Sequence, residues 1–375
     1  MKSQVIQTLI LAVCVSLPLA ILGADKTEES DIARHAFVIW ETKAGPQLAA
    51  ELAIGTYPQN ALMSKIMSDG KQANRDVADS PEALITNEFQ LTLTADKSAI
   101  LENYYGNDAK KYADMVFRNI QETQKWNKLV ADIKFQTKSM FGDTIRVRYV
   151  KINKDPKAFQ MPWSSLCEKI NGRYYFTHTN TENSLFAMVS ELYPFKDASR
   201  NNVDVKTLLS LKKVSLAPQK NSNAKIDTNV VIYYNLNQFS RNEALRKETQ
   251  QVLETMLQAY ENKDIPALLT VWHPDRRTAM QGKMTGDSYS FDQSKQYFSQ
   301  AKSFSMDFYI GDLDNLFVFS RRILKDGSID KTPKLYLFRR HDQKLYLTDK
   351  AASAPVLSII NTPQMAAELN KQLPQ

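Results

Sequence analysis

The feature that most constrains the fold is an internal repeat, in which two pairs of matching segments occur in the same order. The segment that begins at Asp96 (DKSAILENY) matches the segment that begins 168 positions later at Asp264 (DIPALLTVW). The segment that begins at Leu166 (LCEKINGRYYFT) matches the one that begins 171 positions later at Leu337 (LFRRHDQKLYLT). The two offsets differ by three residues, which a small change in loop length explains, so we predict that one structural unit occurs twice.

Apolar periodicity predicts the same succession of elements in both copies. In the second copy, helical spacing predicts a helix over 245–260, and Asp264 begins a second, short helix. Alternating apolar residues predict strands around 306–310, 317–319, 335–337 and 345–347, and around 133–135 and 145–149 in the first copy. Asn171-Gly172 and Asp326-Gly327 are turn signals. We therefore predict the α+β fold class, with an antiparallel meander packed on helices in each copy.

This plan resembles the nuclear-transport-factor-like superfamily, a cystatin-like α+β group that includes SnoaL-like and ketosteroid-isomerase-like proteins. The segment 260–275 (YENKDIPALLTVWHPD) carries most of the resemblance. The resemblance covers the second copy and, less fully, the first. It implies two cone-shaped domains, each a curved antiparallel sheet packed on N-terminal helices around a pocket. Some members use that pocket for isomerisation, hydration or ring closure and others only bind or dimerise, so the fold does not decide the function.

The repeat divides the chain into six predicted regions. These are a signal peptide (1–24), an irregular or partly helical N-terminal arm (25–80), a first nuclear-transport-factor-like domain (81–200), a strand-rich connector (201–240), a second such domain (241–350), and a C-terminal linker with a short helix (351–375). The connector would either extend a sheet or bridge the two domains. Thr362-Pro363 is the expected start of the last helix.

The amino-terminal segment has the pattern of a secretory signal peptide. Lys2 precedes an apolar run from Val5 to Leu22, and a small residue, Ala24, stands at the expected cut. Cleavage would leave a soluble periplasmic or secreted protein. The apolar run is also long enough to cross a bilayer. An uncleaved signal, which would tether the protein to the membrane, is therefore the alternative.

Charge and cysteine content limit the partners of the exported chain. The full chain has 48 basic and 41 acidic residues, and loss of Lys2 leaves 47 against 41, a net charge of +6. The cations alternate with acids, which, together with export, excludes nucleic acid as a partner. An anionic envelope component would suit the excess charge, and a solvated surface is the alternative. Cys167 would be the only remaining thiol, with a strand-like context that predicts a buried, inert group.

No cofactor is predicted. The chain has no G-x-S-x-G, Walker-type or G-x-G-x-x-G motif, which sets nucleotide chemistry aside. Its four histidines, at 35, 178, 273 and 341, show no metal-ligand spacing, so no metal site is predicted either.

The catalytic set of the ketosteroid-isomerase-like proteins is missing. The resemblance puts Met280 where a carboxylate base would stand and Met256 where a tyrosine would stand, and neither side chain can do that chemistry. His273 and Asp275 are the candidate acid/base pair that remains. The structural alternative is that His273 ends a helix, Pro274 breaks it and Asp275 caps the following residues.

Two further sets of residues are candidate binding groups. The candidates for lining an apolar pocket are Tyr104, Trp272, Met256, Met280, Phe308, Phe317 and Phe319. Core packing is the alternative for them, and aromatics exposed on the open sheet face would instead indicate pairing of the two copies. The candidates for an anion-binding patch are Arg321, Arg322, Arg339 and Arg340, with a solvated sheet edge as the alternative.

These observations favour an exported, non-enzymatic protein of the cell envelope that binds a ligand or another protein. Its partner would be a small apolar ligand, an envelope protein or a second copy in a homodimer. An isomerase or hydrolase that uses His273 and Asp275 in the pocket of the second domain is the alternative function.

Overall fold

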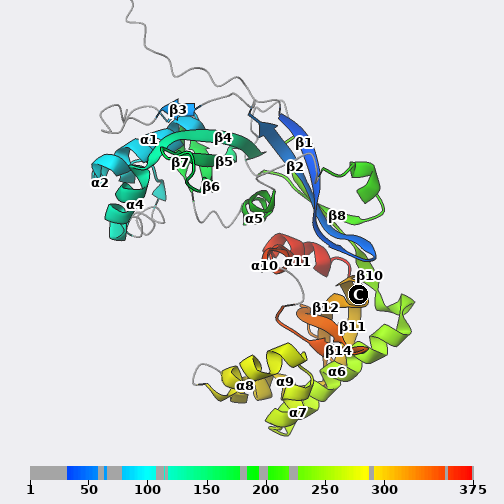
Figure 1. The fold of residues 1–375 in the computed structure, drawn as a ribbon. Coiled ribbons are helices and arrows are strands. Elements are labelled where there is room, and N and C mark those ends of the chain that lie inside the picture. The colour runs from blue at the N-terminus through cyan, green and yellow to red at the C-terminus, as the bar shows by residue number, and fades with distance from the viewer. Residues whose placement is uncertain are drawn as a thin grey trace, which may run out of the picture.

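The computed structural model describes residues 32–57, 63–65, 78–106, 114, 117–177, 184–193, 202–218, 227–286, 291–350 and 354–373. Helices and antiparallel strands both contribute to this part of the chain, in the order that Figure 1 shows, which confirms the predicted α+β class. The predicted signal peptide lies outside the described residues. Among the described helices, none combines the length and the apolar character that crossing a bilayer requires.

We call residues 81–176 the first unit. Its elements are α1 (Pro81–Thr94), α2 (Lys97–Leu101), α4 (Ile120–Asn127), β4 (Val130–Phe141), β5 (Thr144–Asn153), β6 (Met161–Ile170) and β7 (Arg173–Phe176). α1 begins where the Ser80 hydroxyl accepts a hydrogen bond from the Ala83 amide, at 3.1 Å. The strands pair in chain order, and the predicted Asn171-Gly172 turn joins β6 to β7 with positive φ at both residues.

We call residues 243–347 the second unit. Its elements are α6 (Glu243–Glu261), α7 (Ile265–Thr270), η5 (Pro274–Arg276), α8 (Arg277–Thr285), α9 (Phe291–Ser299), β11 (Ala301–Gly311), β12 (Asn315–Leu324), β13 (Lys334–His341) and β14 (Lys344–Leu347). The long helix and the meander of strands lie where periodicity predicts them. β10 (Leu236–Gln238) pairs with β11 and completes a five-stranded sheet in the order β10-β11-β12-β13-β14.

The repeated segments make the same contacts in both units. Asp96 and Asp264 each accept a hydrogen bond from the amide three residues later, at 3.1 and 2.9 Å, and so cap α2 and α7. The Phe176 amide donates to the Asn103 carbonyl at 2.9 Å, and the Leu347 amide donates to the Val271 carbonyl at 2.8 Å. Each of these partners is offset by the same spacing that the sequence segments show.

The prediction of an irregular or partly helical arm at 25–80 is wrong, because most of its described residues form a long β-hairpin. β1 (Ile32–Thr42) pairs with β2 (Gly45–Thr56) along almost its whole length. Residues 47–55 of β2 are all buried, so both faces of the strand are covered and its sequence shows no alternation. The short strand β3 (Met63–Lys65) pairs with β4.

β2 joins the connector to the first unit. One edge of β2 pairs with β1, and its other edge pairs with β9 (Val230–Tyr234) through residues 48–51 and with β4 through residues 53–56. The resulting sheet has the order β7-β6-β5-β4-β2-β9-β8, where β8 is Lys212–Leu216 and follows the short helix η3 (Val205–Leu208). Only Asn235 separates β9 in this sheet from β10 in the second sheet, and η4 (Phe239–Arg241) then leads into α6.

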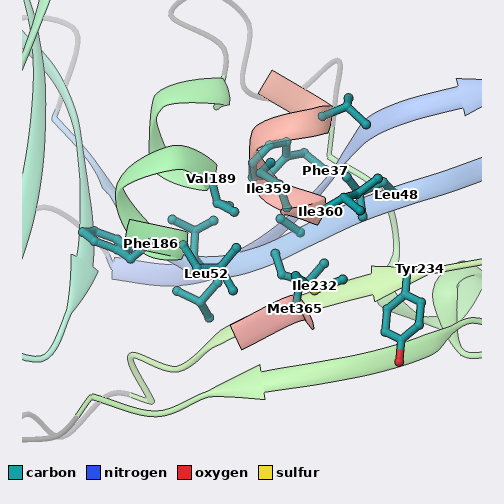
Figure 2. Close-up of a cluster of buried hydrophobic side chains, with 14 of the residues drawn as sticks. Phe37, Leu48, Leu52, Phe186, Val189, Ile232, Tyr234, Ile359, Ile360 and Met365 are labelled. Carbon is teal, nitrogen blue, oxygen red and sulfur yellow. The ribbon is translucent and has the colours of Figure 1, made fainter. Parts of the chain in front are cut away.

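A central core lies between the two units. It brings together the hairpin, α5 (Ser184–Leu192), β9, α10 (Ala354–Ile360) and α11 (Pro363–Asn370), and Figure 1 shows α5, α10 and α11 between the units. Figure 2 shows its buried side chains Phe37, Leu48, Leu52, Phe186, Val189, Ile232, Tyr234, Ile359, Ile360 and Met365. Helix α5, which falls within the range predicted for the first domain, therefore packs here.

The C-terminal segment is more helical than predicted. The expected linker 351–355 overlaps α10, which begins at Ala354 because a proline in the first turn, here Pro355, does not disturb a helix. Thr362 caps α11 as predicted, since its side chain accepts a hydrogen bond from the Met365 amide at 3.4 Å.

Candidate functional sites

Three predicted pocket-lining aromatics, Phe308, Phe317 and Phe319, do not face the interior of the second unit. They project from the opposite face of its sheet into the central core, where the ring centres of Phe317 and Trp40 are 5.0 Å apart. Their neighbours Leu316 and Val318 face the interior instead. Both faces of β12 are covered, so period two marks the strand without telling which face is inside. The prediction for these three residues is therefore corrected.

The remaining candidates in the second unit are part of its own core. Met256 and Met280 are buried there, and Trp272 packs against the same cluster. The indole N–H of Trp272 is buried and makes no hydrogen bond within the described part of the chain. These three side chains therefore offer thioether sulfur and an aromatic ring, and none of them is an acid or a base.

The predicted anion patch does not form. Arg321 makes two hydrogen bonds of 3.0 Å to the carboxylate of Asp307, and Arg340 makes two of 2.9 and 2.8 Å to that of Glu248. The register also separates the two pairs, because Arg339 lies opposite Asn315, at the other end of β12 from Arg321.

The other two arginines of that set are likewise committed to protein groups. Arg322 makes two hydrogen bonds to Asp330, at 2.7 and 3.1 Å, and its guanidinium lies 3.4 Å from the ring centre of Tyr297. Arg339, which is exposed, lies 3.7 Å from Asp275. Ion pairing therefore accounts for these side chains without an external anion.

His273 and Asp275 meet at the end of the second unit's sheet. His273 Nδ1 lies 2.5 Å from Asp275 Oδ1, and the backbone N–H of His273 donates to the Leu347 carbonyl at 2.8 Å. His273 is 5% exposed, and the centre of its imidazole ring lies 5.2 Å from the ring centre of His341. α7 has already ended at Thr270, and His273 is the N-cap of η5. The pair thus fixes the turn between α7 and α8, and its histidine is largely closed to solvent.

The first unit carries a titratable group that sequence reasoning missed. Glu88 of α1 stands 168 positions before Met256, and Tyr104 stands 168 before Trp272, so the same two places are polar in one unit and apolar in the other. The Tyr104 hydroxyl donates to Glu88 Oε1 at 2.9 Å, and the Asn103 amide donates to Oε2 at 2.8 Å. Extending the repeat register into the long helix would have found this acid.

Burial favours the neutral, protonated form of the Glu88 carboxyl group. It raises the pKa of Glu88 to about 7, while the hydrogen bonds from Asn103 and Tyr104 act in the opposite direction. Tyr104, predicted to line a pocket, is instead buried against Phe176 and acts as a hydrogen-bond donor to the acid.

Other polar groups in and beside the first unit also have partners within the protein. The Tyr57 hydroxyl donates to the carboxylate of Glu82. Cys167 is fully buried, as predicted, and burial raises the pKa of its thiol above the usual range. Lys151 Nζ lies 4.1 Å from the ring centre of Phe89 and 3.8 Å from that of Trp163, and burial lowers its pKa to about 7.

Within the described ranges, no group of three His, Cys, Asp or Glu side chains is placed to hold a metal ion. His178 lies outside them.

Comparisons with known proteins give no family for this chain. No protein-family model matches it, and no curated protein matches it. Among solved structures, the solution structure of a SEC-C motif containing protein from Rhodopseudomonas palustris has 19% sequence identity over 27% of this chain and 77% of that chain. Its TM-score of 0.21 is too low to carry an argument about fold or function.

We expect Glu88→Gln to stabilise the protein selectively at alkaline pH. The pKa of Glu88 is raised from 4.5 to about 7, so the folded state holds this proton more tightly than the unfolded chain. The stability linked to that proton is full below about pH 4.5 and is lost as pH rises through 7. Glutamine cannot ionise, so the variant should be about 1–2 kcal/mol more stable than the native protein at pH 8.

Urea unfolding at pH 4.5 and at pH 8 measures this difference. Glu102→Gln, an exposed acid on the same unit, is the matched control and should change stability little at either pH. An equal effect of Glu88→Gln at both pH values would contradict the burial of a titrating carboxyl group.

Proposed function

We propose that this chain is an exported protein of the cell envelope that acts by binding or protein interaction and not by catalysis. It is built from two cone-shaped, nuclear-transport-factor-like units. The shared helix caps, the shared bonds that tie each short helix to the last strand, and the antiparallel sheets support the two-unit reading.

The observation that carries the proposal is the chemistry at the equivalent inner positions of the two units. Proton abstraction needs a base that can reach a ligand. In the second unit the place of the base is taken by Met280 and that of the tyrosine by Met256, and both are buried among apolar side chains. In the first unit the residue 168 positions before Met256 is Glu88, both of whose oxygens already accept hydrogen bonds from the protein. Neither arrangement leaves a base directed at a substrate.

The packing of the units favours binding of a partner protein over binding of a small apolar ligand. Phe308, Phe317 and Phe319 are aromatics on the outer sheet face, and they are covered by the central core within the same chain. The methionines proposed as pocket lining are part of the packed interior. The outer surfaces of the units are therefore the parts left to contact a partner.

A proton-exchange assay tests the absence of catalysis. The purified protein is incubated with cyclic ketones in D₂O and with a panel of simple esters, and exchange and hydrolysis are followed by NMR. We expect rates equal to those in buffer for the native protein, for His273→Ala and for the control His35→Ala. A rate above buffer that His273→Ala abolishes and His35→Ala retains would instead establish the isomerase or hydrolase function of the His273 and Asp275 pair.

Fractionation tests the export. We expect the protein outside the cytoplasm, in the fraction that is soluble in high salt, with an amino terminus at Asp25 after removal of residues 1–24. A membrane-bound protein that retains Met1 would show a tether, and a cytoplasmic one would contradict the proposal.

A further inference from the structure

Four large apolar side chains are exposed at one end of the first unit. Trp126 is 61% exposed, Leu129 44%, Phe159 80% and Trp163 40%. Single exposed apolar residues are common on proteins, but a group of large ones indicates an interaction site. We call these four residues the distal patch.

Backbone pairing places the distal patch at a single end of the sheet. Trp126 lies in the last turn of α4, and the Leu129 amide donates to its carbonyl at 3.1 Å. Leu129 in turn accepts from the Lys154 amide at 2.8 Å, which joins the start of β4 to the end of β5. Phe159 lies in the loop from β5 to β6, and Trp163 lies at the start of β6.

This end points away from the rest of the molecule. β4 enters at Val130, beside the patch, and only its far end, residues 137–140, pairs with β2 and thereby reaches the central core. In Figure 1, α4 lies at the outer side of the first unit, far from α10 and α11. The described elements of the central core and the second unit therefore leave the patch uncovered.

Cations surround the distal patch. Lys125 and Lys128 flank Trp126 and Leu129, and Lys154 and Lys157 lie on the loop that carries Phe159, all four exposed. Within the described part of the chain none of the four forms an ion pair. The one acid on that loop, Asp155, already accepts a hydrogen bond from the Lys157 amide at 2.9 Å.

The patch also has a fixed aromatic anchor. Lys151 Nζ lies 3.8 Å from the ring centre of Trp163 and 4.1 Å from the centre of the buried ring of Phe89. This contact orients Trp163 against the body of the unit. The exposed part of its ring is therefore held in place before any partner binds, which lowers the ordering cost of binding.

We propose that the distal patch docks the protein onto the surface of an anionic phospholipid bilayer. Tryptophan, phenylalanine and leucine insert at the level of the head groups, and lysine side chains reach past them to lipid phosphates. The four lysines supply the charge complementarity that an anionic surface requires. Salt screens the attraction between each lysine and the lipid head groups, so binding should weaken as salt is added. The inference rests on the proposed function in one respect, since export brings the patch to an envelope membrane.

Vesicle co-sedimentation tests this docking on the protein recovered from the soluble fraction. We expect binding to vesicles of phosphatidylglycerol and phosphatidylcholine, little binding to phosphatidylcholine alone, and a marked loss of binding in 0.5 M salt. Trp126→Ala with Phe159→Ala, and separately Lys128→Gln with Lys154→Gln, should each lower partitioning to the anionic vesicles by about tenfold or more. Leu209→Ala with Leu313→Ala removes exposed apolar side chains elsewhere and should leave partitioning unchanged.

Three outcomes would overturn the docking. These are no binding to anionic vesicles, binding that neither patch variant reduces, and a concentration-dependent dimer of the native protein that the Trp126 and Phe159 variant abolishes. The last would mean that the patch pairs with a second copy. Circular dichroism of each variant checks that folding is retained. Fractionation reports on export and this assay on docking, so failure of one is distinguishable from failure of the other.

Discussion

Phe317→Ala should lower the free energy of unfolding by about 3–5 kcal/mol, the usual cost of removing a fully buried aromatic side chain. Phe317 is 0% exposed and lies on the outer face of the second sheet, where its ring meets that of Trp40 in the hairpin. Its removal leaves a cavity where the second unit and the hairpin meet. Both the second unit and the central core should therefore unfold at lower denaturant concentration.

Guanidinium unfolding followed by far-ultraviolet circular dichroism measures the loss. Phe159→Ala is the control, because it removes the same ring from a position that is 80% exposed and should change stability by less than about 0.5 kcal/mol. A loss of less than about 1 kcal/mol for Phe317→Ala would mean that the second sheet does not pack on the hairpin as described.

Gly311→Ala should destabilise the protein by about 3 kcal/mol or more, a cost expected when a backbone position has no room for a methyl group. Gly311 ends β11 with a φ of +131°, and a Cβ atom there would lie 2.1 Å from the backbone oxygen of Asn315. It would also lie 3.1 Å from Cη2 of Trp40, so the tight turn into β12 and the hairpin contact would both have to shift.

The control for this substitution is Gly327→Ala. Gly327 also has a positive φ, of +87°, but a Cβ atom there would meet nothing within 4 Å. It should cost only the conformational penalty of about 1–2 kcal/mol. Thermal unfolding of the two variants separates steric clash from backbone strain, and equal losses would contradict the close approach at Gly311.

Local signals in the sequence were sufficient for the elements of the repeated units. The period of α6, the capping aspartates and the turns at Asn171-Gly172 and Asp326-Gly327 each act within a few residues, so they could be predicted without the tertiary structure. β2 could not be predicted in the same way. Its residues from Leu48 to Ile54 are buried on both faces, and this removes the alternation that marks a strand.

The candidate sites show the same division. His273 and Asp275 are two positions apart, and their contact follows from local geometry. The partners of Arg321 and Arg340 are Asp307 and Glu248, which lie 14 and 92 positions away in the sequence and reach the arginines through strand register and helix packing respectively. Tertiary contacts therefore determine which arginines form ion pairs, and the arginine pairs in the sequence do not by themselves indicate their partners.

The central core also has a consequence for the order of folding. Phe37 of β1 and Leu369 of α11 belong to one hydrophobic cluster although 332 positions separate them. Each unit can form from contacts within about 100 residues, but the hairpin waits for partners from α5, β11 and β12, and finally α10 and α11. Contacts over such long separations form slowly. During folding the apolar faces of β2 and of the second sheet therefore stay open until α10 and α11 pack on them, and open apolar strands of this kind are prone to aggregation.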